Sequence, residues 1–414
     1  MGNLVKIAVR NLLRYTRRSL LTVSLIAFGV VFVLVFVAMT GSFKEAIVAS
    51  ITDSYLGHLQ VHRRGYVASI ESLPLNLNLE PAQLAAIQEA LGRLPDVAGA
   101  SERIKFNAMF STFVETTGMR VTAVYPDREF AVSPKLPARI VQGDRTPVAL
   151  ARGKILVPDL LARGMGIKVG DTVVVVATNK DGSVNGKTVV VSGILESATG
   201  PGGRDGYIHF EDGREILRMP GREAMEVAIR LRDFGQIERV GAALRERLEG
   251  RDAGGAALEV HTWAQLSPFA TIATLIDMMA LFMKVMLIAI VLISVLNVMI
   301  MAVYERVREI GTIAAIGTLP HKILALFLVE GVVLGAAGAA AGVLGGAAII
   351  LALNIWKVSI AFGGARQVFV LGPRIDPYEV VLASVMVIVV SVVASVQPAV
   401  RASRMEPIDA LRHV

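Results

Sequence analysis

Residues 19–43 read SLLTVSLIAFGVVFVLVFVAMTGSF, a run of 25 residues that contains no charged side chain. An α-helix rises 1.5 Å per residue, so about 20 apolar residues cross the hydrocarbon core of a membrane. The run is too long for the apolar core of a cleaved signal peptide, which spans about 7–15 residues, and no clear small-x-small cleavage site follows it. We therefore interpret it as a retained membrane span.

Three further uncharged runs follow, at residues 285–304, 331–356 and 380–400. The whole chain is 54% hydrophobic and 19% charged, whereas soluble domains are about 45–50% apolar and about 25% charged. It contains no cysteine, which excludes disulfides and cysteine-ligated zinc. The sequence predicts an integral membrane α-helical protein with four transmembrane helices.

The net charge of +7 comes from the segments that flank these runs. Residues 44–259 carry 27 basic and 27 acidic side chains, and the rest of the chain carries 15 basic and 8 acidic ones. A nucleic-acid footprint would place a basic excess on the large domain. The charge therefore reports membrane topology and argues against a nucleic-acid partner.

Basic residues orient a membrane protein because they concentrate on the cytoplasmic side of its spans. Short segments on one side carry eleven of them: Lys6, Arg10, Arg14, Arg17, Arg18, Arg306, Arg308, Lys322, Arg401, Arg404 and Arg412. The short segment on the other side, residues 357–379, carries three. We expect both termini and the 305–322 loop in the cytoplasm, and residues 44–270 in the periplasm.

The predicted organisation runs along the chain as follows. Residues 1–18 form an amphipathic helix in the cytoplasmic interface, with a disordered basic tail as the alternative. The remaining segments are a first span (19–43), a periplasmic domain (44–270), a second span with an extracytoplasmic extension (271–304), a cytoplasmic loop (305–322), a third span (323–356), a short periplasmic loop (357–379), a fourth span (380–400) and a cytoplasmic tail (401–414).

The region outside the membrane mixes strand and helix patterns. Two valine-rich runs, 172–177 and 188–195, flank a turn-rich loop and predict a β-hairpin. Helical spacing of apolar residues appears over 82–94 and 236–248. We expect a large α+β domain of two lobes: a mixed lobe built from 44–130 and 221–270, and a β-rich insert at 131–220.

Neither chemical motif in this region predicts a catalytic or metal site. Gly186-Lys187-Thr188 resembles the end of a phosphate-binding loop, but Asp181 stands where that motif requires glycine. His58 and His62 would lie about 13 Å apart on a strand, too far to share a metal, so we interpret them as surface histidines. We expect no catalytic residue, metal or cofactor in this chain; if it belongs to an ATP-driven complex, ATP and Mg²⁺ are bound by a separate ATPase.

Three separated segments carry a family resemblance. Residues 8–14 read AVRNLLR, residues 305–317 read ERVREIGTIAAIG, and residues 398–412 read PAVRASRMEPIDALR. Together with the four spans they resemble the FtsX/MacB/lipoprotein-releasing (Lol) superfamily of ABC transporter permeases. Gly57-His58-Leu59-Gln60-Val61 is most similar to the lipoprotein-releasing branch. The resemblance implies a homo- or heterodimer of permeases working with two cytoplasmic ATPase subunits.

The resemblance also implies that the 305–322 loop contains a coupling helix that docks on the ATPase. A mixed-charge rim around a small apolar face suits such a surface, whereas ordinary juxtamembrane charge is the alternative. The residues expected to contribute to coupling are Glu305, Arg306, Arg308, Glu309, Ile310, Gly311, Ala315 and Gly317.

Two stripes within the spans predict further roles. Small residues let helices approach closely in lipid, and a packing seam is preferred to a pore lining for Gly331, Gly335, Gly338, Gly342 and Gly345. Asn297 in the second span is expected to form a hydrogen bond between helices. Phe28, Phe32 and Phe36 are spaced by four residues; they are expected either to face lipid or to line a lateral entry for a hydrophobic substrate. Glu330 is expected to form a hydrogen bond within the bundle, with proton coupling as the alternative.

The function expected from these observations is that of an inner-membrane permease subunit. It would extract lipoprotein or another amphiphile from the outer leaflet, with ATP hydrolysed by its partner and cargo passed to a periplasmic carrier or adaptor. The alternatives are a MacB-like mechanotransmission efflux permease and an FtsX-like regulator of a cell-wall enzyme.

Overall fold

The computed structural model describes residues 2–196, 205–248, 257–357, 359–361, 368–370 and 372–406. It divides into two compact units. The membrane unit comprises Met1–Ala46, Ala273–Ile360 and Val368–Val414, and the outer domain comprises Ile47–Ile272 and Ala361–Gln367. Residues 407–412 of the predicted C-terminal motif lie outside the described residues.

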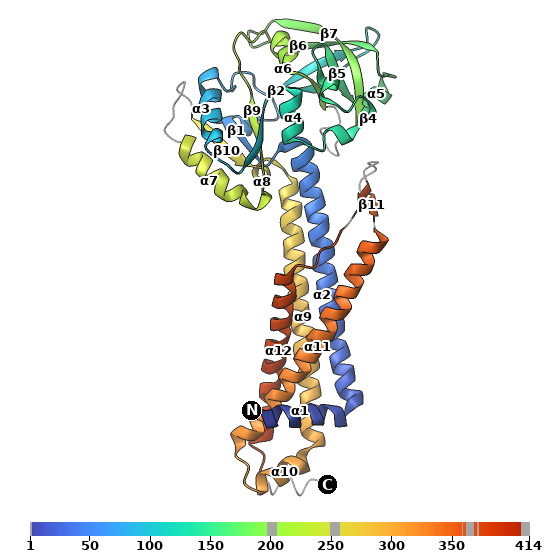
Figure 1. The fold of residues 1–414 in the computed structure, drawn as a ribbon, viewed down its shortest axis with the longest axis vertical. Helices are drawn as coiled ribbons and strands as arrows, with labels where there is room; N and C mark the ends of the chain where they lie inside the picture. The colour runs from blue at the N-terminus through green and yellow to red at the C-terminus, as the bar shows by residue number, and fades with distance from the viewer. Residues whose placement is uncertain are drawn as a thin grey trace. The chain divides into compact units, whose positions relative to one another are not determined.

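The membrane unit is helical. Its helices are α1 (Gly2–Arg14), α2 (Thr16–Ile51), α9 (Phe269–Glu305), α10 (Val307–Ala315), α11 (Pro320–Trp356) and α12 (Pro377–Ser403). Within the described residues, four helices are long and apolar enough to cross a membrane, and they contain the four predicted spans. They pack as a bundle, and α1 lies across one end of it (Figure 1). The four-span prediction is confirmed.

Local sequence explains where these helices begin. Pro320 and Pro377 occupy first-turn positions of α11 and α12, where proline loses no hydrogen bond and fixes a helical φ. Asp376 caps α12, because its side chain accepts a 2.9 Å hydrogen bond from the Tyr378 amide. Between α11 and α12, β11 (Ser359–Ala361) and β12 (Val368–Val370) pair in a two-stranded sheet.

A single ten-stranded sheet forms the centre of the outer domain. Its strands are β1 (Leu59–Arg63), β2 (Val97–Ser111), β3 (Thr116–Val124), β4 (Ile140–Gly143), β5 (Lys154–Pro158), β6 (Thr172–Thr178), β7 (Val184–Leu195), β8 (Asp205–His209), β9 (Glu226–Leu231) and β10 (Leu258–Thr262). The order is β10-β1-β9-β2-β3-β8-β5-β7-β4, and β6 pairs with β2 and β7. The predicted hairpin is confirmed as β6 and β7, which pair antiparallel from Thr172↔Val190 to Thr178↔Val184.

Helices of the outer domain cover this sheet. They are α3 (Pro81–Gly92), α4 (Pro126–Val132), α5 (Asp159–Gly164), α6 (Phe210–Ile216), α7 (Ile237–Leu248) and α8 (Trp263–Leu266); α3 and α7 match the helical patterns seen in the sequence. The strands of the predicted insert do not form a sheet of their own. β8 pairs parallel with β3, and β6 pairs with the far end of β2, so both predicted lobes share one sheet.

Candidate functional site

The elbow between the second span and the coupling helix is centred on Arg306. This residue separates α9 from α10, and its side chain is only 5% exposed. Its Nη1 donates a 2.9 Å hydrogen bond to Oε1 of Glu330, which is itself 2% exposed. The guanidinium also lies 4.7 Å from the centre of the Tyr15 ring. Arg306 is therefore not part of the exposed surface of the coupling segment, because it pairs with Glu330 inside the bundle.

Two acidic side chains of the same segment pair with the N-terminal region. Glu305 forms an ion pair with Arg18 at 2.5 Å, and Glu309 forms one with Arg14 at 3.3 Å. Asn11 of α1 donates a 2.8 Å hydrogen bond to Glu330. We call Asn11, Arg14, Arg18, Glu305, Arg306, Glu309 and Glu330 the elbow cluster. No sequence pattern singles out Asn11 beyond its place in the family-like 8–14 segment.

The exposed surface of the coupling segment is narrower than predicted. Ile310 and Gly311 are buried, so neither belongs to the exposed part of the coupling segment. Arg308, Glu309 and Ala315 are exposed. Gly317 is exposed with φ of 95°, a left-handed conformation that ends α10.

Apolar side chains complete this exposed surface. Ile316 is 80% exposed, and Ile313 and Leu319 are also exposed. Exposed apolar residues next to Arg308 and Glu309 match the anatomy of a protein interface, in which an apolar centre has a polar rim. We call Arg308, Glu309, Ile313, Ala315, Ile316 and Leu319 the coupling surface.

The glycine stripe of α11 faces two different helices. Side chains added at Gly331 and Gly335 would meet Ser395 and Ser391 of α12, whereas at Gly338 and Gly342 they would meet Ile26 and Val30 of α2.

Gly345 continues the seam, because a Cβ added there would lie 3.0 Å from the side chain of Val31. Gly346, which the sequence pattern missed, packs against Leu34. The hydrogen bond between helices that was expected for Asn297 is not formed within the described residues. The Asn297 side chain is instead exposed on α9.

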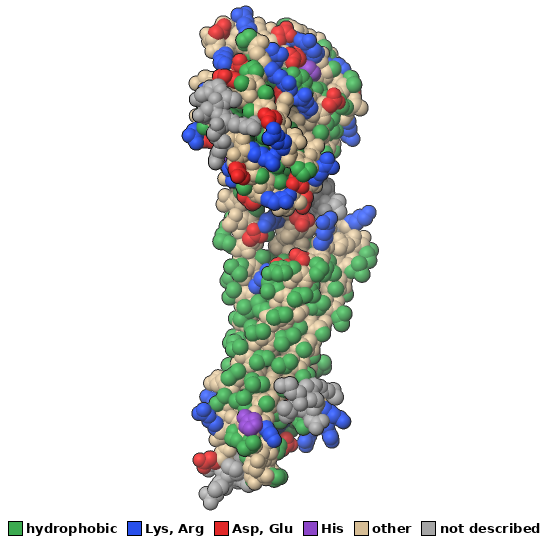
Figure 2. Space-filling view, turned by 60° about the vertical axis from the view of Figure 1, so that its left-hand side comes forward, with side chains coloured by type: hydrophobic (Ala, Val, Ile, Leu, Met, Phe, Trp, Pro, Cys, Tyr) green, Lys and Arg blue, Asp and Glu red, His purple; other side chains and the backbone are tan. Residues whose placement is uncertain are grey.

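The phenylalanine stripe lies on the surface of the bundle. Phe28 is 69% exposed, Phe32 is exposed and Phe36 is half-buried. The Phe32 and Phe36 rings stack with centroids 6.2 Å apart. The visible face of the bundle is mostly hydrophobic (Figure 2), as a lipid-facing surface requires. The stripe therefore lies on the outer surface of the bundle in the single chain.

In the outer domain, basic side chains bind the segment that follows α2. Carbonyl oxygens at the end of a helix lack intrahelical donors and favour cations. Arg103 donates to the Tyr55 oxygen at 2.7 Å, and Arg139 donates to the Ser54 oxygen at 3.3 Å. Arg230 pairs with Asp53 at 2.6 Å.

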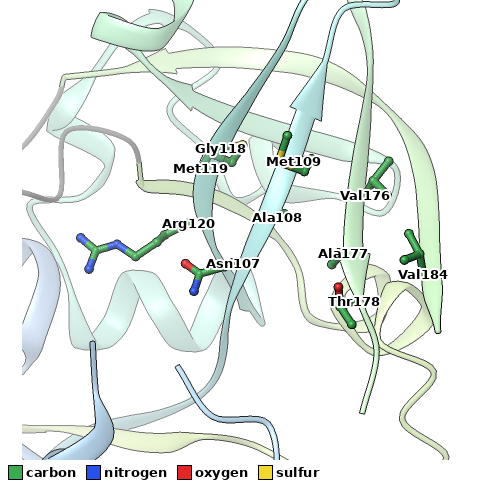
Figure 3. A pocket seen from close by; sticks show the side chains of 10 residues that line it. All are labelled: Asn107, Ala108, Met109, Gly118, Met119, Arg120, Val176, Ala177, Thr178 and Val184. Carbon is green, nitrogen blue, oxygen red and sulfur yellow. The ribbon is translucent and has the colours of Figure 1, made fainter. Parts of the chain in front are cut away.

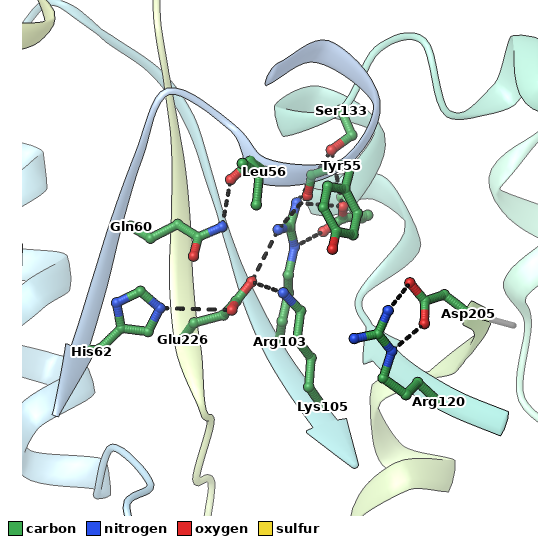
Figure 4. Close-up of polar contacts among 11 residues, drawn as sticks. Tyr55, Leu56, Gln60, His62, Arg103, Lys105, Arg120, Ser133, Asp205 and Glu226 are labelled. Atoms are coloured by element: carbon green, nitrogen blue, oxygen red, sulfur yellow. Dashed lines mark hydrogen bonds and ion pairs between the residues drawn. The ribbon is translucent and has the colours of Figure 1, made fainter. Parts of the chain in front are cut away.

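Arg103 is also the centre of a buried charged network (Figure 4). It makes two hydrogen bonds to Glu129, at 2.7 and 2.9 Å, and lies 3.1 Å from Glu226. Glu226 also pairs with Lys105 at 2.8 Å. Burial alone would raise the pKa of the Glu226 carboxyl, but Lys105, His62 and Arg103 outweigh it and hold that pKa well below its usual range. The network pairs two cations, Arg103 and Lys105, with two carboxylates, Glu129 and Glu226. It holds β2, β9 and α4 around the segment that follows α2.

The predicted surface histidines are buried, which is a correction. β1 pairs with β10 on one side and β9 on the other, so it is a central strand rather than an exposed one. Nδ1 of His58 accepts a 3.1 Å hydrogen bond from the Leu231 amide. His62 stacks on Tyr66 and lies 3.7 Å from Glu226. Among the described residues, no group of three potential ligands could hold a metal.

The outer domain contains a partly open pocket of about 680 Å³ (Figure 3). It opens where the pairing of β2 with β6 ends at Met109↔Val176. Its lining residues are Asn107, Ala108, Met109, Gly118, Met119, Arg120, Val176, Ala177, Thr178 and Val184. Arg120 is held by Asp205, with nitrogen–oxygen distances of 2.6 and 3.1 Å.

The Gly186-Lys187-Thr188 segment lies on strand β7 and is therefore not a phosphate-binding loop. The Lys187 side chain forms an ion pair with Asp212.

Two family models match the chain. Residues 19–247 match the MacB-like periplasmic core domain, and residues 281–407 match the FtsX-like permease C-terminal region. The chain is 25% identical over 338 residues to the lipoprotein-releasing system transmembrane protein LolC of Xylella fastidiosa, covering 77% of this chain and 78% of that protein.

Other similar proteins align with a smaller share of this chain. The macrolide export ATP-binding/permease protein MacB of Bdellovibrio bacteriovorus is 28% identical over 236 residues, or 54% of this chain and 34% of that protein. The solved extracellular domain of the transporter YknZ from Gram-positive bacteria aligns with a TM-score of 0.36 and 13% identity, over 50% of this chain and all of that domain. The periplasmic region of MacB from Actinobacillus actinomycetemcomitans aligns with a TM-score of 0.35 and 8% identity, over 54% of this chain and 94% of that region.

Proposed function

The chain belongs to the inner-membrane ABC transporter permeases of the MacB/FtsX/LolC family, and from this premise we propose that it moves lipoprotein or another amphiphile out of the outer leaflet. Permeases of this family work with cytoplasmic ATPases. We propose that ATP and Mg²⁺ are bound by a dimer of such ATPase subunits, and that a second permease, identical or not, completes the membrane part. A periplasmic carrier or adaptor would receive the cargo.

The observation that carries the proposal is the extent of the match to LolC. That alignment covers 77% of this chain, whereas the MacB alignment covers 54% of it. Lipoprotein release therefore has more support than macrolide export. Efflux and cell-wall regulation are the outcomes against which the proposal is tested.

The phenylalanine stripe supplies a place where an acyl chain could bind. Phe28 and Phe32 are exposed along one face of α2, and aromatic rings offer large apolar surfaces to a ligand. An acyl chain that leaves the bilayer at this face would exchange lipid contacts for ring contacts. The protein part of the cargo would remain outside the membrane.

Photo-cross-linking tests this proposal in reconstituted membranes. A photoreactive amino acid replaces Phe32, and the matched control replaces Leu281, which is exposed on α9. We expect position 32 to capture a triacylated protein and not its unacylated form, and position 281 to capture neither above background. Equal capture at both positions, or preferential capture of the unacylated protein, would contradict the proposed cargo.

A further inference from the structure

We propose that Glu330 is a positioning residue for energy coupling: through Arg306 and Asn11 it locks the coupling helix and α1 onto α11. The proposal rests on the proposed function only in requiring a docked ATPase that moves α10. Glu330 belongs to α11, Arg306 to the elbow between α9 and α10, and Asn11 to α1. One carboxylate thus joins three segments that are far apart in the sequence.

The elbow itself depends on Arg306. α9 ends at Glu305 and α10 begins at Val307, so Arg306 is the residue at which the chain changes direction. A short connection between two helices could bend in several ways if its side chain were free. Here the guanidinium is buried, donates to Glu330 at 2.9 Å and lies over Tyr15 at 4.7 Å. A buried charge requires its partner, so other directions of the elbow would leave two charges unpaired.

The same carboxylate oxygen also holds α1. Nδ2 of Asn11 lies 2.8 Å from Oε1 of Glu330, the atom that also accepts from Arg306. Nη2 of Arg306 in turn lies 3.5 Å from the Asn11 backbone oxygen. Asn11, Arg306 and Glu330 therefore form a closed triangle.

This arrangement determines where a movement of α10 is transmitted. If the elbow were flexible, displacement of α10 by an ATPase would be absorbed at residue 306. With the triangle intact, the displacement passes to α11, whose glycine seam contacts α12 and α2. Coupling between distant sites needs such a contiguous element with defined arrangements.

Spin-label distances in the isolated, full-length permease test the lock directly. The chain lacks cysteine, so paired labels can be placed at Ile313 and Leu344 to follow α10, and at Ile7 and Leu344 to follow α1; all three side chains are exposed. We expect narrow distance distributions in the wild type. Glu330→Gln should widen both distributions by about twofold or more, because the charge that holds Arg306 is lost.

Two further variants keep the test decisive. Asn11→Ala should widen only the α1 distribution, and it remains informative if Glu330→Gln fails to insert. Glu379→Gln is the matched control, because it breaks the Lys284–Glu379 ion pair between α9 and α12 without touching the triangle. Unchanged distributions in both Glu330→Gln and Asn11→Ala would overturn the proposal, and so would equal widening in Glu379→Gln.

A coupling measurement separates positioning from simple loss of structure. Glu330→Gln should still co-purify with the ATPase, yet release about tenfold fewer cargo molecules per ATP hydrolysed. Normal release per ATP would contradict the positioning role. If the wild type releases no acylated cargo, the proposed function fails, and the distance distributions still decide the role of Glu330.

Discussion

Nη1 of Arg14 lies 3.3 Å from Oε1 of Glu309, although 295 residues separate them in the chain. Both side chains are largely exposed, and surface ion pairs of this kind contribute only about 0.2–1 kcal/mol. The pair can therefore open when a partner offers Glu309 a better-placed cation. α1 and the coupling helix are linked, but the acid remains available to an ATPase.

Glu309→Lys should weaken recruitment of the ATPase. The substitution reverses the charge at the rim of the coupling surface, and loss of a charged partner that becomes buried in a complex costs about 2–5 kcal/mol. Arg14→Gln is the control, because it removes the intramolecular partner and leaves the acid. Co-purification should fall for Glu309→Lys only; equal recruitment by both variants would remove Glu309 from the interface.

Ile316→Asp should have a similar effect through the apolar centre of the coupling surface. Ile316 is 80% exposed in the single chain, so a charge there should barely change its thermal stability. In a complex the carboxylate would be desolvated without a partner. Val148→Asp, at an exposed position of the outer domain, controls for added charge. Unaltered ATPase-binding affinity in Ile316→Asp would show that this residue stays outside the interface.

Gly342→Ala should destabilise the membrane unit. A Cβ there would lie 2.5 Å from Cβ of Val30 and 2.9 Å from the Ala27 backbone oxygen, and overpacking of this kind costs about 1–3 kcal/mol. Gly41→Ala is the matched control in α2, where the added Cβ meets no described atom within 4 Å apart from its chain neighbours and the adjacent backbone of its own helix. Thermal unfolding in detergent should separate the two variants, and equal midpoints would argue against a tight seam.

His58→Asn should remove part of the acid sensitivity of the outer domain. Burial and, secondarily, Arg230 lower the pKa of His58 from 6.5 to about 4. The unfolded chain therefore binds the proton more readily, so this contribution to stability is complete above pH 6.5 and is lost as the pH falls towards 4.

Asparagine can still accept the hydrogen bond from the Leu231 amide, but it does not titrate. The full-length variant should lose less stability than the wild type between pH 6.5 and pH 4. Parallel losses of stability in the two proteins over this range would contradict the assignment.

Periodicity and charge were sufficient to predict the bundle. Four uncharged runs mark the spans, and the spacing of Gly331 to Gly345 places these glycines on one helix face, which contacts α12 and α2. The seam's division between α12 and α2 could not be predicted, because helical spacing defines a face and not the neighbour that covers it. The elbow cluster was also beyond reach, since Asn11 and Glu330 are 319 residues apart.

Sequence reasoning was wrong where tertiary pairing overrode local pattern. His58 directly precedes β1 and His62 lies within it; a local strand pattern cannot show that β9 and β10 flank this strand and that both histidines are buried. The family resemblance placed Gly311 and Arg306 in the loop that docks on the ATPase, but a resemblance does not show which side chains of that loop are exposed. The structure uses them for packing and for a buried ion pair instead.

Cargo release from proteoliposomes tests the central claim most directly. The permease is reconstituted with its ATPase and a triacylated protein, and soluble cargo is measured with ATP, with a non-hydrolysable analogue and with Glu309→Lys in place of the wild type. The account predicts release that requires hydrolysis, requires the acyl chains and is lost in Glu309→Lys. Release of unacylated protein or of a small soluble compound under the same conditions, with no release of the triacylated form, would contradict it.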